Sequence, residues 1–319
     1  MHVVIVNNTK IPVFHYGGTE RVIWAEGKEL VRMGHKVTFL VKKGSFCPFA
    51  AVKFLNEKED LNKQIPEDCD VVHLHFPLYQ SLNKPYVVTI HGNGKKGEIF
   101  DINSVFLSED HAKRHNSKIY VFNGLDFEQY GSIDWNLQRS HVLFLAKAKR
   151  KEKNLKGAIR ICNKANERLV VVGGYGFDIT GKVVYKGFLG GDKKNKELNS
   201  SKCLLSPVLW NEPFGLSVIE SLYFGSPVIA TPFGSLPQIV IKEVGFLSDS
   251  FSELAYAVKN CESYNRKFCH EYCCDLFSSR KMTEKYLELF SKVLNGEKLN
   301  TENPRTLDNY LEQKFVIRE

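Results

Sequence analysis

The sequence contains no apolar run long enough to cross a membrane. A membrane-spanning helix needs about 20 predominantly apolar residues, and no segment of the 319-residue chain approaches that length. The first residues, MHVVIVNN, lack the basic flank and the long apolar region of a signal peptide and are typical of a first β-strand. We therefore expect a cytoplasmic protein.

The eight cysteines lack the arrangement of a disulfide framework or a zinc site. Because they are spread through a chain expected in the cytoplasm, we interpret them as free thiols. The densest group contains Cys261, Cys269, His270, Cys273 and Cys274, without the two C-x₂-C pairs that bracket a zinc knuckle. This group gives little support to a metal site.

Two further patterns are incomplete as metal sites. Asp68-Cys69-Asp70 has a D-x-D spacing, but it precedes a predicted strand, so we interpret it as a loop. His73 and His75 alternate along that strand, and the sequence places no third ligand beside them. We therefore expect no metal.

Charge of one sign does not dominate the chain. Lysine and arginine total 44 against 36 acidic residues, and the net charge of +8 does not by itself indicate a nucleic-acid partner. Basic residues cluster at 147–156 and at 193–196. These clusters favour an anionic ligand or a membrane surface, although a solvated helix face explains the second cluster equally well.

Two series of buried strands are predicted. The composition, 43% hydrophobic and 25% charged, is that of an ordinary globular protein, and the length corresponds to two domains of roughly 150 residues. Continuous apolar runs at 3–6 and 37–41 flank a glycine loop and a helical pattern, which together form a βαβ unit. A second series begins at 142–146. The fold class is therefore α/β, with two Rossmann-like parallel-sheet domains.

The domain boundary is predicted where this pattern breaks into polar residues, around 134–139. We assign residues 1–138 to an N-terminal domain and residues 139–298 to a C-terminal domain. Residues 299–319 then form a tail that we expect to return to the N-terminal domain.

The glycine loops argue against hydride transfer. Gly17 and Gly18 permit close approach of the backbone to a ligand, but they are not a G-x-G-x-x-G, and no acidic residue follows the second strand. The cluster at 173–176 precedes a strand-like segment where a dinucleotide fingerprint requires a helix. A dehydrogenase is therefore poorly supported.

Residues 211–235, NEPFGLSVIESLYFGSPVIATPFGS, carry the strongest functional signal. Glu212 and Glu220 stand eight positions apart and flank a Pro-Phe-Gly turn at the start of a predicted helix. A nucleotide diphosphate is bound by backbone N–H groups and a helix N-terminus, and a carboxylate can bind the ribose hydroxyls. The stretch supplies all of these parts.

These motifs, in this order, resemble the retaining glycosyltransferases of the GT-B fold, family 4 type, over nearly the whole chain. The most specific match is the E-x₇-E from Glu212 to Glu220, followed by GSPVIA at 225–230. Supporting motifs stand at 17–22, 34–37, 89–92 and 123–126. The resemblance implies two facing domains with a donor site in the C-terminal one.

The resemblance also implies residue roles on the donor. Glu220 corresponds to the carboxylate that binds the ribose hydroxyls, and Glu212 to the residue that contacts the transferred sugar. Lys153 corresponds to the lysine on the diphosphate. Lys147 stands where the family usually has arginine, so it keeps the charge and loses the two-pronged donor.

Backbone and N-terminal groups complete the implied site. Phe214, Gly215 and Leu216 correspond to the turn whose N–H groups face the sugar and the diphosphate. Gly17 and Gly18 correspond to the loop that approaches the phosphates from the other domain. The catalytic residues that the resemblance implies are His91, Lys153 and Glu212.

The implied activity is transfer of a sugar, with retention, from a nucleotide-diphosphate donor to a glycan or lipid-linked acceptor, as in polysaccharide biosynthesis. No cofactor or metal is expected, and no nucleic acid. The basic surface and the habit of the family favour a peripheral membrane encounter. Two alternatives stay open: a nucleotide-sugar epimerase on the same fold, and a non-catalytic nucleotide-sugar-binding protein.

Overall fold

The chain forms two compact units, each built around its own parallel sheet. The structure is a computed structural model and describes residues 1–13, 17–311, 313 and 315–319. Unit 1 contains Met1–Val13, Gly17–Leu125 and Ser278–Gln313, and unit 2 contains Asp126–Phe277 with 315–319.

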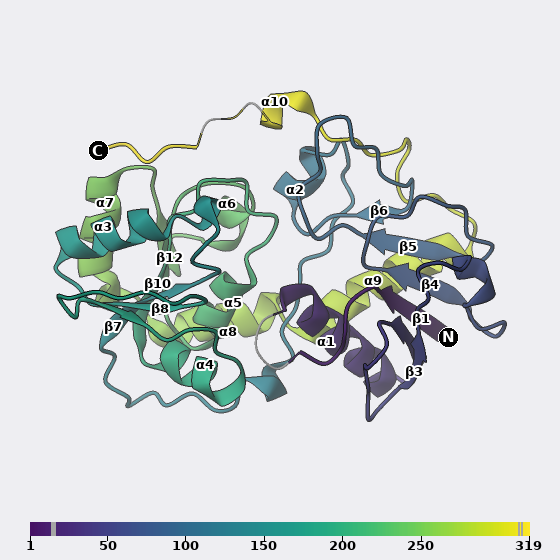
Figure 1. Cartoon of the computed structure of the whole chain (residues 1–319), viewed down its shortest axis with the longest axis horizontal. Helices are drawn as coiled ribbons and strands as arrows, with labels where there is room; N and C mark the ends of the chain where they lie inside the picture. Colours follow the sequence, from purple (N-terminus) through teal and green to yellow (C-terminus); the bar gives the residue numbers. More distant parts are fainter. Residues whose placement is uncertain (14–16, 312, 314) are drawn as a thin grey trace. The chain divides into compact units, whose positions relative to one another are not determined.

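Unit 1 holds a six-stranded parallel sheet in the order β3-β2-β1-β4-β5-β6 (Figure 1). The strands are β1 (His2–Asn7), β2 (Lys36–Val41), β3 (Ala51–Phe54), β4 (Val71–Leu74), β5 (Tyr86–Thr89) and β6 (Ser104–Val105). The helices are α1 (Gly18–Arg32), α2 (Glu109–Lys113), α9 (Ser279–Leu294) and α10 (Asp308–Leu311), with the 3₁₀ turn η1 (Leu61–Lys63). All six residues of β1 are buried, because helices and loops cover both faces of a parallel sheet.

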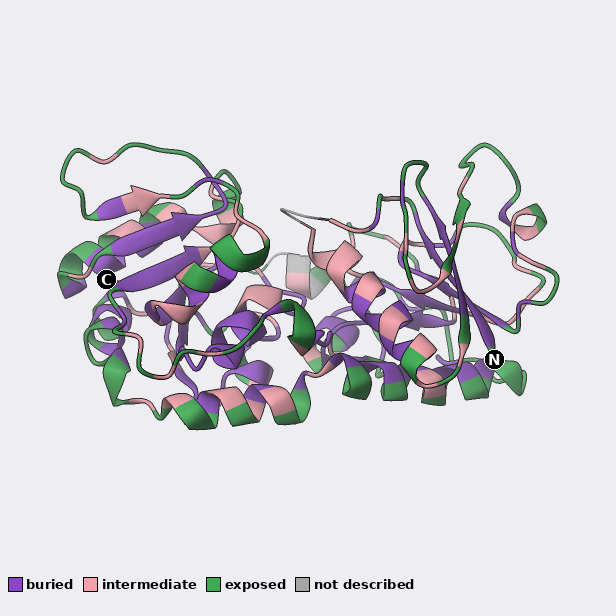
Figure 2. Ribbon diagram, turned by 90° about the horizontal axis from the view of Figure 1, so that it is seen from below, coloured by how far each residue is buried: buried purple, intermediate pink, exposed green. Residues whose placement is uncertain are grey.

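Unit 2 repeats this architecture with the order β12-β11-β10-β7-β8-β9. The strands are β7 (His141–Leu145), β8 (Leu169–Val172), β9 (Val183–Tyr185), β10 (Ser201–Ser206), β11 (Val228–Ala230) and β12 (Gly245–Leu247). The helices are α3 (Leu155–Ala165), α4 (Gly191–Asn199), α5 (Leu216–Tyr223), α6 (Leu236–Ile239), α7 (Phe251–Lys259) and α8 (Arg266–Leu276), and the 3₁₀ turns are η2 (Phe127–Gln129), η3 (Lys151–Lys153) and η4 (Cys261–Ser263). Figure 2 shows most strand residues buried, whereas several helices carry exposed residues on their outer sides.

Both sheets follow the strand order of a doubly wound nucleotide-binding fold. Numbered from the first strand of its unit, each sheet reads 3-2-1-4-5-6. The direction of winding reverses between the first and fourth strands, which are β1 and β4 in unit 1 and β7 and β10 in unit 2. The prediction of two Rossmann-like α/β domains is confirmed.

The boundaries of the units differ from the predicted domains. The chain enters unit 2 at Asp126, earlier than the predicted 139, and leaves it after Phe277. Helix α9 therefore lies in unit 1, where it packs against α1, although its residues fall inside the predicted 139–298 domain. Its buried residues Tyr286 and Phe290 repeat at helical spacing, and that pattern does not specify which sheet the helix covers.

The tail after α9 is shared between the units. In unit 1, the Phe100 N–H donates to the Pro304 carbonyl over 2.7 Å, which agrees with the expected return. In unit 2, the Phe251 N–H donates to the Arg318 carbonyl over 2.7 Å, so 315–319 do not follow the predicted assignment of 299–319.

Buried histidines should make unit 1 sensitive to acid. His75, His111 and His115 are at most 5% exposed. Burial lowers the pKa of His75 and of His115 to about 4, and that of His111 well below its usual range. In the unfolded chain each titrates near pH 6.5. Between these values the unfolded chain binds more protons, so the free energy of unfolding falls as the pH falls.

Urea unfolding at about pH 7.5 and about pH 5 checks this expectation. A single histidine with a folded pKa of about 4 should cost about 2 kcal/mol at the lower pH. The variant His115→Gln should recover part of that loss. Equal unfolding free energies at the two pH values would contradict the expectation.

Candidate functional site

The predicted donor residues follow two neighbouring strands of unit 2. Lys147 and Lys153 follow β7, and Glu212 follows β10. These strands pair in parallel at the point where the winding of the sheet reverses. Ligands of doubly wound sheets bind outside the carboxyl ends of such strands. The sheet therefore brings together side chains that lie 59 positions apart in the sequence.

Lys153 and Glu212 form an ion pair at this edge. The Lys153 ammonium donates to Glu212 Oε2, and their side chains are 16% and 10% exposed. The Trp210 indole N–H donates to the same oxygen over 3.0 Å. The ammonium also lies 4.7 Å from the centre of the Trp210 ring, within the range of a cation–π interaction. Trp210 was missed by sequence reasoning, because no motif includes it.

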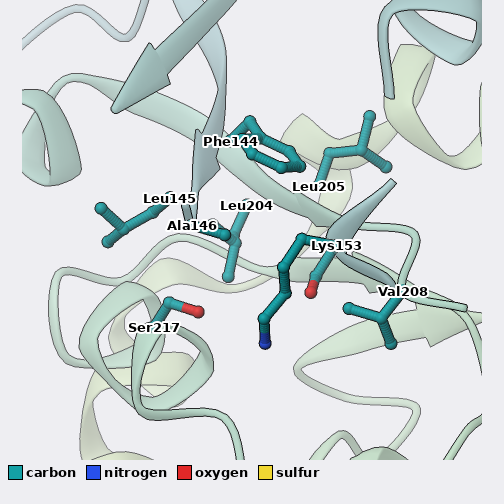
Figure 3. Close-up of a pocket in the computed structure, with 9 residues that line it drawn as sticks. Phe144, Leu145, Ala146, Lys153, Leu204, Leu205, Val208 and Ser217 are labelled. Atoms are coloured by element: carbon teal, nitrogen blue, oxygen red, sulfur yellow. The ribbon is translucent and has the colours of Figure 1, made fainter. Parts of the chain in front are cut away.

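A small pocket opens beside Lys153. Its lining consists of Phe144, Leu145, Ala146, Lys153, Leu204, Leu205, Ser206, Val208 and Ser217. Figure 3 shows the Lys153 ammonium and the Ser217 hydroxyl reaching toward the same space, from η3 and from the start of α5. The pocket therefore combines an apolar wall from β7 and β10 with one cation and hydroxyl groups.

The turn before α5 is held by a close backbone contact with a second glycine turn. Gly215 has φ +92° and precedes the helix. Ser235 donates its N–H to the Glu212 carbonyl over 2.9 Å and its hydroxyl to the Phe214 carbonyl over 2.8 Å. A Cβ on Gly234 would lie 2.3 Å from the Glu212 nitrogen, so this approach requires glycine.

Helix α5 begins directly after this turn, at Leu216. The first N–H groups of a helix have no partners within the helix and form the positive end of its dipole. The predicted backbone donors at 214–216 are thus at the start of a helix that adjoins the Lys153 pocket through Ser217. Such an N-terminus suits an anionic ligand.

Glu220 lies one turn further along α5 and is buried. Its Oε1 accepts the Tyr130 hydroxyl over 2.8 Å and also accepts from the Lys194 ammonium. The side chains of Lys194 and Glu220 are 6% and 7% exposed. The Lys194 ammonium lies 4.9 Å from the centre of the Tyr130 ring. The carboxylate is thus paired with a cation from α4.

Lys194 was missed by sequence reasoning. The interpretation of 193–196 as a solvated helix face is correct for Lys193 and Lys196, which are exposed. It is wrong for Lys194, which is buried. Leu198, four positions later, is also buried. Because residues four apart share a helix face, the i, i+4 pair with Leu198 was the available signal.

The predicted residues of unit 1 lie at the equivalent edge of its sheet. Gly17 has φ +158° and precedes α1, which starts at Gly18. A Cβ on Gly17 would lie 2.6 Å from Glu20 Oε2 and 2.8 Å from Val13 Cγ2, so any other residue there would have to displace these side chains.

His91 follows β5 and is half-buried. Its Nε2 lies 2.9 Å from His75 Nδ1. Burial, and secondarily the neighbouring His75, lowers the pKa of His91 well below its usual range. The imidazole is therefore neutral at pH 7. Gly17, Gly18 and His91 thus belong to unit 1, whereas the predicted lysines and glutamates belong to unit 2.

One cluster of the described residues has a donor set that could hold a metal ion. Glu26, His73 and His75 are buried, and one ligand atom of each lies within 4.8 Å of the others. The sequence indicated the two histidines, and α1 supplies the carboxylate that the sequence pattern lacked.

Solved structures share this architecture over almost the whole chain. AviGT4, a glycosyltransferase involved in avilamycin A biosynthesis, matches with a TM-score of 0.76 and 19% identity over 92% of this chain and 98% of its own. Sucrose-phosphate synthase from Thermosynechococcus elongatus matches with a TM-score of 0.70 and 16% identity, over 93% and 100%. The fold is that of the GT-B glycosyltransferases. At such identities these structures show the fold alone.

Sequence comparisons match part of the chain, and the family-model match lies within unit 2. Residues 132–267 match the family model of glycosyl transferases group 1. An uncharacterized 41.2 kDa protein in the cps region of Klebsiella pneumoniae is 29% identical over 119 residues, which are 34% of this chain and 32% of that protein. An uncharacterized glycosyltransferase of Methanocaldococcus jannaschii, MJ1607, is 30% identical over 96 residues, 27% and 24% of the two chains.

These matches span about a third or less of the curated relatives. A glycosyltransferase activity is therefore a proposal for the whole chain. Family 4 membership, retention and the individual residue roles stay predictions. Among the described residues, no helix combines the length and the apolar character that a membrane span requires.

Proposed function

We propose that this chain transfers a sugar from a nucleotide-diphosphate donor to a glycan or lipid-linked acceptor, with retention and without a metal ion. The observation that carries the proposal is the Lys153–Glu212 pair beside the start of α5. A cation, a carboxylate and a helix N-terminus at the carboxyl edge of a doubly wound sheet suit a nucleotide sugar. Alr3699/HepE from Anabaena, which was solved in complex with UDP-glucose, is similar to this chain with a TM-score of 0.65 and 15% identity.

In this proposal the protein stabilises the departing nucleotide diphosphate. Lys153 and Lys147 neutralise charge on the phosphates, and the first N–H groups of α5 add their dipole. Before the donor binds, Lys153 is paired with Glu212. The diphosphate then shares the ammonium, and the Glu212 carboxylate gains a sugar hydroxyl as a donor.

The transfer step needs little covalent work from the protein. The bond between the anomeric carbon and the phosphate oxygen breaks, and the acceptor oxygen bonds to the same face of that carbon. The acceptor proton moves to the leaving phosphate. Glu220 holds the ribose hydroxyls, and neutral His91 accepts a hydrogen bond near the reacting sugar.

The acceptor and its location are part of the proposal. The basic cluster at 147–156 would attract an anionic acceptor or membrane surface. We therefore propose a cytoplasmic enzyme that meets a lipid-linked acceptor at the membrane face.

A donor panel tests this function. Nucleotide-diphosphate sugars are added to the protein in a thermal-shift screen, because a ligand that binds the folded state raises the melting temperature. The donor that stabilises most is then assayed with acceptors, with and without a chelator. We expect transfer that survives chelation and a product that keeps the anomeric configuration by NMR.

Other outcomes of this assay would contradict one part of the proposal or favour an alternative function. Activity lost to the chelator and restored by Mg²⁺ or Mn²⁺ would contradict metal independence, and an inverted product would contradict retention. A new epimer formed from the donor alone would favour the epimerase. Donor binding without any turnover would favour a binding protein.

A further inference from the structure

A buried chain of polar side chains in unit 1 connects helix α1 to His91. Glu26 of α1 and His73 of β4 have no exposed side-chain surface, and Glu26 Oε1 lies 2.6 Å from His73 Nδ1. The other ring nitrogen of His73 lies 2.8 Å from Thr89 Oγ1, which lies 2.9 Å from the Tyr286 hydroxyl. Both nitrogens of His73 are therefore engaged.

His75 continues the chain toward the predicted active site. It follows His73 by two positions, just beyond the end of β4, and the two ring centroids lie 4.2 Å apart. Its Nε2 lies 3.4 Å from Glu26 Oε2, and its Nδ1 lies 2.9 Å from His91 Nε2. The rings of His75 and His91 are stacked with centroids 5.2 Å apart. His75 thus stands between the carboxylate and His91.

Glu26 occupies a position where a helix of this kind normally buries an apolar side chain. Its neighbours Val22, Ile23 and Leu30 on α1 are all buried. An unpaired buried carboxylate is costly. Burial would raise the pKa of Glu26, but the neighbouring His73 and His75 hold it down to about 2. The carboxylate is ionised at pH 7.

An ionised carboxylate only accepts hydrogen bonds, whereas a neutral imidazole donates from one nitrogen and accepts at the other. Burial lowers the pKa of His75 to about 4 and that of His91 well below its usual range, so both are neutral at pH 7. Glu26 Oε2 lies 3.4 Å from His75 Nε2 without a hydrogen bond between them, but its negative charge repels a lone pair at that nitrogen and so favours the His75 proton on Nε2. Nδ1 of His75 then carries no proton and accepts a hydrogen bond from the Nε2–H of His91.

We infer that Glu26 is a positioning residue that fixes the tautomer of His91 through His75. The chain of contacts leaves His91 with its proton on Nε2 and a lone pair on Nδ1. That nitrogen can accept a hydrogen bond from a hydroxyl group of the donor sugar or of the acceptor. The consequence for turnover rests on the proposed function, whereas the tautomer itself does not.

The geometry distinguishes this relay from a metal centre. Two donors bound to one tetrahedral ion at roughly 2.0–2.1 Å lie about 3.3 Å apart. Glu26 Oε1 and His73 Nδ1 are 2.6 Å apart, which is the separation of a short charge-assisted hydrogen bond.

Nitrogen NMR of the full-length protein tests the inference. Long-range ¹H–¹⁵N spectra separate protonated from bare ring nitrogens, and a His91→Gln variant assigns the His91 signals. We expect His91 in the wild type to be protonated on Nε2 and bare on Nδ1. In Glu26→Gln the amide can donate to His75 Nε2, so the His91 signals should shift toward the opposite tautomer.

The matched control is Glu29→Gln. Glu29 is a buried carboxylate on the same helix, and its Oε2 lies 3.3 Å from Arg32 Nη1. The Glu29→Gln substitution should leave the His91 signals unchanged. Glu26→Asp keeps a carboxylate and should retain the wild-type tautomer at least in part. In turnover, Glu26→Gln should lower kcat about tenfold or more with an unchanged KM for the donor, because the wrong tautomer impairs a catalytic histidine.

Wild-type His91 protonated on Nδ1 would overturn the inference without any variant, even if Glu26→Gln fails to fold. An unchanged tautomer in a folded Glu26→Gln would also overturn it, as would one equivalent of metal bound by Glu26, His73 and His75. If the tautomers behave as expected and no donor is ever turned over, the relay stands and the proposed transferase function fails.

Discussion

Lys153→Ala is expected to lower kcat about 100- to 1000-fold, the usual loss when one preorganised group that stabilises transition-state charge is removed. The ammonium is held in place by Glu212 and by the Trp210 ring, so it is already ordered before the donor binds. Its removal takes the cation away from the predicted diphosphate position and leaves Glu212 without its partner.

Steady-state kinetics with the donor found in the panel measure this effect. Lys151→Ala is the matched control, because Lys151 lies in the same 3₁₀ turn and is exposed. It should keep kcat within about twofold of the wild type, as surface substitutions away from a site usually have small effects. A Lys153→Ala enzyme with wild-type turnover would remove Lys153 from the diphosphate site.

Glu220→Ala is expected to destabilise unit 2 by about 3–5 kcal/mol, because it leaves the buried Lys194 ammonium without its carboxylate. Lys194 is only 6% exposed, so water cannot replace the lost partner easily, and the Tyr130 hydroxyl loses its acceptor as well. Urea unfolding measures the loss. Glu271→Ala, on the exposed side of α8, is the control and should change stability little.

Adding Lys194→Met to Glu220→Ala should restore much of the stability, because apolar side chains of similar size often replace a buried ion pair without loss. The folded double variant then isolates the ribose role of Glu220. Its affinity for the nucleotide, measured by calorimetry, should be weaker than that of the wild type. An unchanged affinity would exclude Glu220 from the ribose site. A single variant as stable as the wild type would contradict the buried pair.

The sequence predicted those features that depend on residues close together in the chain. Continuous apolar runs predicted the parallel sheets, and the E-x₇-E marked the turn and helix at Glu212 and Glu220. The resemblance implied that Lys153 and Glu212 both act on the donor, but their ion pair was not predicted, because the sequence does not state that β10 pairs with β7. Strand order decides which loops become neighbours.

Partners supplied by distant elements could not be predicted. Glu26 lies 47 positions before His73, and only the path of α1 across β4 brings the two together. Lys194 reaches Glu220 from α4, across 26 positions. In both cases the residue looks ordinary in its own segment, and its role follows from which face of the helix meets the sheet.

Helix α9 has a consequence for how the protein is made. The hydrogen bond between Thr89 and Tyr286 spans 197 positions, and α9 buries Tyr286, Phe290 and Val293 in unit 1. A ribosome releases the whole of 126–277 before it releases α9. During synthesis the apolar face of unit 1 therefore stays uncovered until α9 is made, whereas 126–277 of unit 2 is already available to fold, so unit 1 does not follow the usual N-terminal-first order of folding.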